Sequence, residues 1–114
     1  MRFIAYLRPS ASGKESKYTV TVFYHKGSKI AHKTIHFGMR GYSDFTQHRD
    51  PLRMKKYQSR HRSRENWNIT GVLTAGFWSR WILWSEPSLL DAIEAITTKF
   101  KIQVIRGQPP FKQS

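Results

Sequence analysis

Apolar and polar side chains alternate near the N-terminus, over the segment from Tyr18 to His25. This segment is β-branched or aromatic almost throughout, and such a composition with a period of two is typical of a strand. Lys26-Gly27-Ser28 has the composition of a turn, and residues 29–37 continue with a second strand-like pattern. The pattern therefore predicts a β-hairpin, followed by a loop at residues 37–44.

Two shorter segments, residues 3–7 and 101–106, also have strand character. Three helices are predicted between the hairpin and the last strand, over residues 50–66, 74–84 and 88–100. The order β-β-β-α-α-α-β predicts an α+β fold. We expect a small antiparallel sheet, made of the N-terminal hairpin and the C-terminal strand, with about three helices packed on one face. We expect one domain over residues 1–106 and a C-terminal tail over residues 107–114.

The second and third predicted helices have the apolar residues of a core. The third carries apolar side chains at helical spacing from Leu89 to Phe100. The second carries Trp78, Trp81 and Trp84 at i,i+3 spacing. We expect these tryptophans to belong to the core, or else to a protein interface, rather than to stack on bases. We also expect the guanidinium group of Arg80 to lie over an indole ring.

The first predicted helix begins at Asp50-Pro51, because Asp is a favoured N-cap and Pro is favoured at the first helical position. Its apolar anchor is thin and consists of Leu52, Met54, Tyr57 and His61. A helix with so little apolar surface is not expected to be a core element. It is either bound to another molecule or solvated.

The positive charge of this helix indicates what it could bind. The chain has 20 Lys and Arg against 7 Asp and Glu, a formal net charge of +13. Solubility alone needs a charge of about 2–8, so the excess favours a polyanionic partner over plain surface charge. Seven cations lie between residues 49 and 64, where Asp50 is the only acid. The predicted polyanion-binding residues are Arg49, Arg53, Lys55, Lys56, Arg60, His61, Arg62 and Arg64.

The spacing along this helix separates two groups of cations. Arg53, Lys56, Arg60 and Arg64 would contact phosphates on one side, while Lys55 and Arg62 would face elsewhere. Gln58 is the only amide side chain placed to read base edges, so we expect binding to be largely independent of sequence.

Catalytic and metal chemistry find little support. The chain has no cysteine, which excludes disulfides, thiolate catalysis and cysteine-based metal sites. His32 and His36 fall on a predicted strand, about 13 Å apart, too far to share a metal ion. Asp44 and His48 could meet as a nuclease-like pair, but a loop Asp more often bonds to its own backbone. We therefore expect neither an enzyme nor a metal or other cofactor.

Two long strings carry a family resemblance. They are Gly41-Tyr42-Ser43-Asp44-Phe45-Thr46 and Thr74-Ala75-Gly76-Phe77-Trp78-Ser79-Arg80-Trp81. Over about residues 17–104, the chain resembles short basic domains of unassigned function encoded by nucleocytoplasmic large DNA viruses, the giant viruses. It departs from them at Asn68-Ile69-Thr70-Gly71, where the family usually has Asp-Pro. The resemblance implies a viral protein that is not secreted, and it brings no catalytic residue.

Two functional hypotheses follow. The first is a small basic virion structural protein that binds nucleic acid through phosphates. The second is a minor capsid (cement) protein on the inner face of the shell, bound to acidic viral capsid proteins. Both place the protein in the virion, and in the host cytoplasm or nucleus during infection. Neither requires a membrane span, and no apolar run in the sequence has the length of one.

Overall fold

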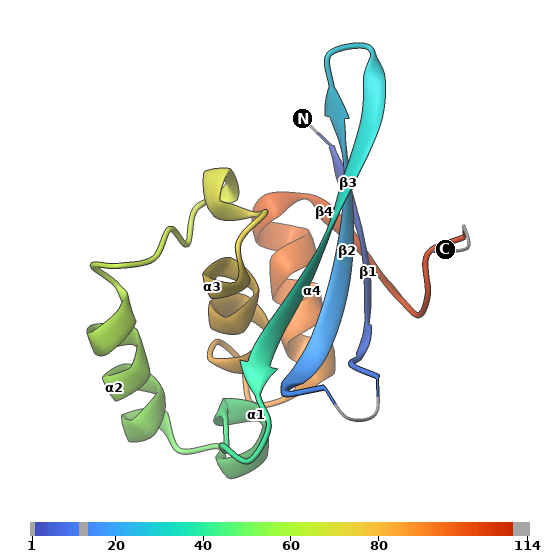
Figure 1. The fold of residues 1–114 in the computed structure, drawn as a ribbon. Helices are drawn as coiled ribbons and strands as arrows, with labels where there is room; N and C mark the ends of the chain where they lie inside the picture. Colours follow the sequence, from blue (N-terminus) through green and yellow to red (C-terminus); the bar gives the residue numbers. More distant parts are fainter. Residues whose placement is uncertain (1, 12–13, 111–114) are drawn as a thin grey trace.

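The computed structural model describes residues 2–11 and 14–110, and its elements follow the predicted order with additional short helical segments. The elements are β1 (Phe3–Pro9), β2 (Ser16–Lys26), β3 (Lys29–Met39), α1 (Phe45–His48), α2 (Pro51–His61), the 3₁₀ turn η1 (Ile69–Gly71), α3 (Ala75–Trp78), the π-helical turn η2 (Ser79–Leu83), α4 (Leu89–Phe100) and β4 (Ile102–Arg106) (Figure 1). The predicted α+β class is confirmed.

The four strands form one mixed sheet in the order β3-β2-β1-β4. β2 pairs antiparallel with both β1 and β3, as the hairpin pattern predicts. β4 pairs parallel with β1, so the prediction of a purely antiparallel sheet is wrong. The direction of β4 is set by α4, because a single residue, Lys101 with φ 58°, turns the chain from the helix into the strand. The chain between β1 and β4, which includes β2, β3 and the helices, supplies the long connection that a parallel pair requires.

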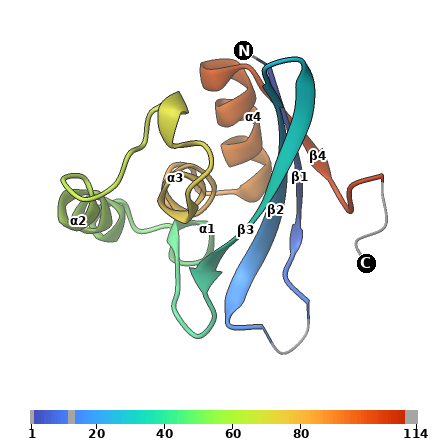
Figure 2. The same cartoon turned by 45° about the horizontal axis from the view of Figure 1, so that its top comes forward.

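The helices α3 and α4 lie against the same face of the sheet (Figures 1 and 2). The alternating positions of β1 and β2 point into this layer, and Leu7, Val20 and Val22 are fully buried there. Phe77, Trp78 and Ile82 meet them from α3 and η2. Burial of each such side chain contributes about 1.5–3 kcal/mol to the hydrophobic stabilisation of the fold.

The predicted helix over residues 74–84 changes its geometry halfway. Thr74 caps it as its pattern predicts, with Oγ1 accepting from the amide of Phe77. From Ser79 the α-helix widens into the π turn η2, which alters the spacing of the side chains that follow. Trp78 is completely buried, whereas Trp81 and Trp84 are only partly buried at the edge of the core. Of the three tryptophans predicted in the core, only Trp78 is completely buried there, and the other two pack against its edge.

The C-terminal segment after β4 starts on the sheet. The amide of Gly107 donates to the carbonyl of Leu7, and Pro109 is buried. Of the predicted tail, residues 111–114 lie outside the described residues. No helix in the described part of the chain combines the length and the apolar character that a membrane span needs.

Candidate functional site

α2 begins as predicted and ends earlier than predicted. Oδ1 of Asp50 accepts a hydrogen bond from the amide of Leu52 at 3.0 Å, and Pro51 occupies the first turn. The helix ends at His61 rather than near Asn66. Beyond it Glu65 turns back, with Oε2 lying 2.9 Å from Nδ1 of His61. The chain after His61 is therefore held by backbone hydrogen bonds from Arg62 to Gln58 and from Arg64 to His61, and by the contact between Glu65 and His61.

An aromatic stack attaches α2 to the rest of the domain. The Tyr57 ring lies between Trp84, at 4.3 Å between centroids and 4° between planes, and His61, at 4.2 Å and 21°. The side-chain amide of Gln58 donates to the carbonyl of Trp84 at 3.1 Å. Leu52 is 62% exposed and is not part of the anchor, contrary to the prediction. Tyr57 is thus the one buried residue of α2, while Met54 and His61 of the predicted anchor are partly buried.

The position of Tyr57 also perturbs its acidity. Burial, with a smaller contribution from the negative charge of Glu65, raises the pKa of Tyr57 to about 12. A side-chain hydrogen bond with Ser79 and the nearby Arg80 and Arg60 oppose this rise. The phenol therefore stays neutral at every physiological pH, and its ring stacks between Trp84 and His61 as an uncharged group.

This pKa predicts a loss of stability in strong base. Tyr57 in the unfolded chain ionises near pH 10, while in the folded protein it stays neutral to about pH 12. The unfolded state then binds fewer protons, so the free energy of unfolding falls as the pH rises through this window, by about 2 kcal/mol. Denaturant unfolding of the wild type and of Tyr57→Phe at about pH 8 and pH 11.5 measures this loss. A wild-type loss no larger than that of Tyr57→Phe would contradict it.

A groove of about 760 Å³ lies between α2 and the body of the domain. α2 lines one side of it, the start of β2 and the end of β3 line the other, and α3 and η2 line its base. We call this hollow the basic groove. Its Lys and Arg side chains are Lys17, Arg53, Lys56 and Arg60, and its acids are Glu15 and Asp44.

The predicted polyanion-binding residues divide between the groove and the outer surface. Arg53, Lys56, Arg60 and His61 line the groove, as their shared helical face predicts. The remaining four do not line it; these are Arg49, Lys55, Arg62 and Arg64, all exposed.

Arg64 was predicted on the same face as Arg60, but α2 ends before it. Its guanidinium group instead donates to the carbonyl of Arg60 at 3.1 Å. Arg49 follows α1 in the left-handed conformation, with φ 55°. The row of cations along the groove side of α2 is therefore three residues long.

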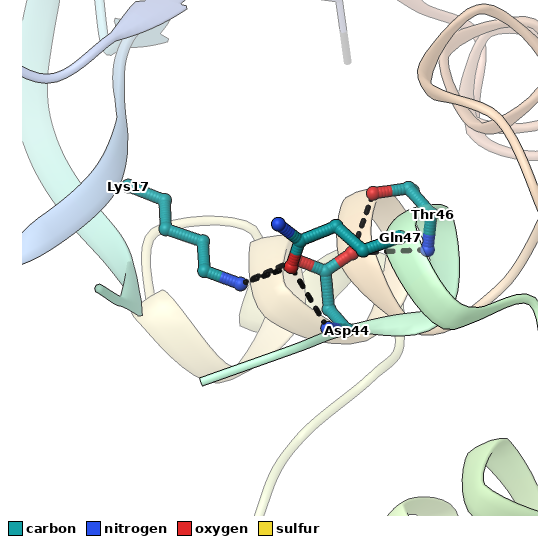
Figure 3. A network of polar contacts seen from close by, with 4 residues as sticks. All are labelled: Lys17, Asp44, Thr46 and Gln47. Atoms are coloured by element: carbon teal, nitrogen blue, oxygen red, sulfur yellow. Dashed lines mark hydrogen bonds and ion pairs between the residues drawn. The ribbon is translucent and has the colours of Figure 1, made fainter. Parts of the chain in front are cut away.

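The loop across the groove contains a polar network around Asp44, which bonds to its local backbone as expected, together with contacts to Lys17 and Gln47 that the sequence analysis did not predict (Figure 3). Asp44 caps α1: it accepts from the amide and the hydroxyl of Thr46, and the side chain of Gln47 accepts from the backbone amide of Asp44. Nζ of Lys17 lies 2.6 Å from Oδ2 of Asp44 and 3.0 Å from Oε1 of Gln47. The carboxylate of Asp44 is thus neutralised and nearly inaccessible. An Asp followed three residues later by Gln is the sequence signal of this cap.

Close approach of the sheet and η2 shapes the groove at Gly38. This residue has φ 74°, and a Cβ there would lie 2.8 Å from Cδ1 of Leu83. Only glycine accepts this combination of backbone conformation and contact without strain. The C-terminal end of β3, at Gly38, can therefore approach η2 closely at the base of the groove.

Asp44 and His48 do not form a catalytic pair. Nδ1 of His48 accepts from the amide of Asp50 at 2.9 Å, while Asp44 is occupied by its cap and by Lys17. Burial lowers the pKa of His48, and the charge of Arg53 lowers it further. Within the described residues, no three His, Asp or Glu side chains are grouped as a metal site would require.

The guanidinium group of Arg80 lies over the tryptophans, as predicted. Its Cζ is 4.1 Å from the ring centroid of Trp81 and 5.2 Å from that of Trp67. Nη1 also donates to the carbonyl of Trp84 at 3.2 Å. Arg80 is therefore a structural cation that holds the edge of the core, and it is not part of the basic groove.

Fold and site together define a small α+β domain with a cationic groove formed by one peripheral helix. The chain belongs to DUF5754, a family of unknown function, whose profile matches residues 5–61. This half of the chain runs from within β1 to the end of α2, and so contains all four Lys and Arg residues of the groove. The comparison with curated proteins gives no significant match, and neither does the comparison with solved structures.

Proposed function

We propose that this protein binds nucleic acid through phosphate contacts in the basic groove, without reading base sequence. The observation that carries the proposal is the row Arg53, Lys56 and Arg60, which lines a hollow and forms no ion pair with a carboxylate among the described residues. Of the two acids that line the hollow, Asp44 is already paired with Lys17, which leaves Glu15 alone against three cations. Such a surface attracts phosphates, and guanidinium groups bind them in bidentate geometry.

The proposed role is structural and not enzymatic. The resemblance to domains of giant viruses supports a place in the virion, and in the host cytoplasm or nucleus during infection. A virion component that neutralises packaged nucleic acid needs phosphate contacts and has no need of base readout.

A salt titration tests the proposal. Each phosphate neutralised contributes about −0.9 to the slope of log K against log salt on duplex DNA, and about −0.7 on a single strand. Three groove contacts predict a slope between about −2 and −3 over roughly 50–200 mM salt, with equal affinity for strands of different sequence. A slope near zero for the unmodified protein would overturn the proposal.

The alternative is a minor capsid protein bound to acidic neighbours in the shell. Exposed apolar side chains near the groove favour it, because Met39, Tyr42 and Leu52 are each more than 60% exposed. The same three cations would then pair with carboxylates of a protein partner. Binding to an acidic capsid protein, together with a flat salt dependence on nucleic acid, would support this second role.

A further inference from the structure

The basic groove restricts the shape of its ligand. A volume of about 760 Å³ lies in the range that encloses one drug-sized molecule. It therefore holds about one or two nucleotides of a strand at a time, whereas a duplex, with two backbones around stacked pairs, is too large to enter it. We infer that the groove accepts a single strand of nucleic acid, and this inference rests on the proposed function.

The cations on α2 match one phosphate backbone. Arg53 and Arg60 are seven residues apart, about 10 Å along the helix axis, with Lys56 between them. Phosphates of a stacked strand repeat about every 3.4 Å along its axis, so about three such steps, between four successive phosphates, span the same row. The cations that do not line the groove, such as Lys55 and Arg62, are left outside this track.

Tyr42 supplies a stacking surface on the opposite side. It lies in the loop between β3 and α1, is 68% exposed, and borders both the basic groove and a second hollow beside α1. Tyr57 and Trp84 also line the groove, but their rings already stack on each other at 4.3 Å. A base that enters between the cation row and the loop therefore meets Tyr42, and stacking of this kind does not depend on which base it is.

Glu15, the second acid of the groove, would repel a bound phosphate. Glu15 is exposed and lines the groove near the start of β2, whereas Asp44 is held by Lys17. Glu15→Gln is therefore expected to strengthen binding of a single strand about two- to fivefold, the range of an exposed charge pair.

The test compares a fluorescent oligothymidine of about 12 nucleotides with a duplex of about 12 base pairs and an abasic strand of equal length, by anisotropy at low salt. We expect the single strand to bind more tightly than the duplex. Tyr42→Ala is expected to weaken binding of the base-bearing strand about five- to one-hundredfold, and Tyr42→Phe is expected to preserve it. The abasic strand is expected to be insensitive to Tyr42→Ala. Melting curves check that both variants fold. Replacement of an exposed ring should not change the melting temperature much.

Other outcomes separate this inference from the proposed function. Tighter binding of the duplex, with the expected salt slope, would overturn the inference that the groove prefers a single strand. It would leave the proposed phosphate-binding function in place. An equal effect of Tyr42→Ala on abasic and base-bearing strands would overturn the stacking contact, and the inference with it. Binding of polyglutamate in place of any nucleic acid would overturn both in favour of an acidic protein partner.

Discussion

Replacement of Arg53, Lys56 and Arg60 by Gln is expected to abolish most of the affinity for nucleic acid while leaving the fold intact. Each of these side chains lines the basic groove, and a hydrogen bond to a charged group contributes about 1.5–3 kcal/mol. Loss of the three contacts should weaken binding at least a hundredfold at low salt. It should also flatten the salt dependence. Anisotropy titrations at several salt concentrations measure both effects.

The matched control removes the same amount of charge from outside the groove. Lys55, Arg62 and Arg64 lie on α2 or just after it, are exposed, and do not line the groove. Their replacement by Gln should reduce affinity only severalfold, through the weaker long-range field. Neither triple variant should change the melting temperature by more than a few degrees, because surface substitutions cost little. Equal losses in the two triple variants would show that net charge, and not the groove, binds the ligand.

Several features of this site were predictable from local chemistry. The start of α2 follows from Asp50-Pro51, because a cap and a fixed φ are properties of the residues themselves. The common face of Arg53, Lys56 and Arg60 follows from helical spacing. The hairpin follows from the alternating pattern of β2. In each case the interacting groups are close in sequence.

The rest depends on contacts between distant segments. At the groove, Lys17 and Asp44, 27 residues apart, join β2 to the loop before α1. The parallel direction of β4 depends on how α4 packs on the sheet, and the local sequence of β4 does not specify this direction. The widening of the helix at Ser79 is likewise invisible in a pattern that continues with a period close to 3.6. Sequence periodicity thus identified the cations, and tertiary structure determined which of them share a hollow.

The attachment of α2 explains how a highly charged helix keeps a defined position. Its cations repel one another, and its single buried side chain, Tyr57, stacks between Trp84 and His61. The stacked rings line part of the groove, and Arg53, Lys56 and Arg60 beside them stay exposed, so the cations remain available to a ligand. Trp84 is held in turn by η2, which packs into the core through Ile82 and Leu83. The core therefore fixes the width of the groove without contributing its charges.

Trp78 is the residue on which this arrangement depends most. Its side chain is completely buried, packs against Phe37 and Phe77, and donates from Nε1 to the carbonyl of Val72 at 2.8 Å. Trp78→Ala removes this volume from the junction of sheet and helices and should cost about 3–5 kcal/mol. A domain of this size has a total stability of about 5–15 kcal/mol, so the variant should melt roughly 10–25 °C lower or fail to fold.

Two further variants keep the prediction testable if Trp78→Ala does not fold. Trp78→Phe retains most of the apolar volume but leaves the carbonyl of Val72 without its donor, which should cost about 1–3 kcal/mol. Trp81→Ala should cost less than Trp78→Ala, because Trp81 is only partly buried and contacts Arg80 and Phe100 at the edge of the core. Denaturant unfolding of the three variants measures this order. A larger loss of stability for Trp81→Ala than for Trp78→Ala would contradict this prediction. It would show that the core depends more on η2 than on Trp78.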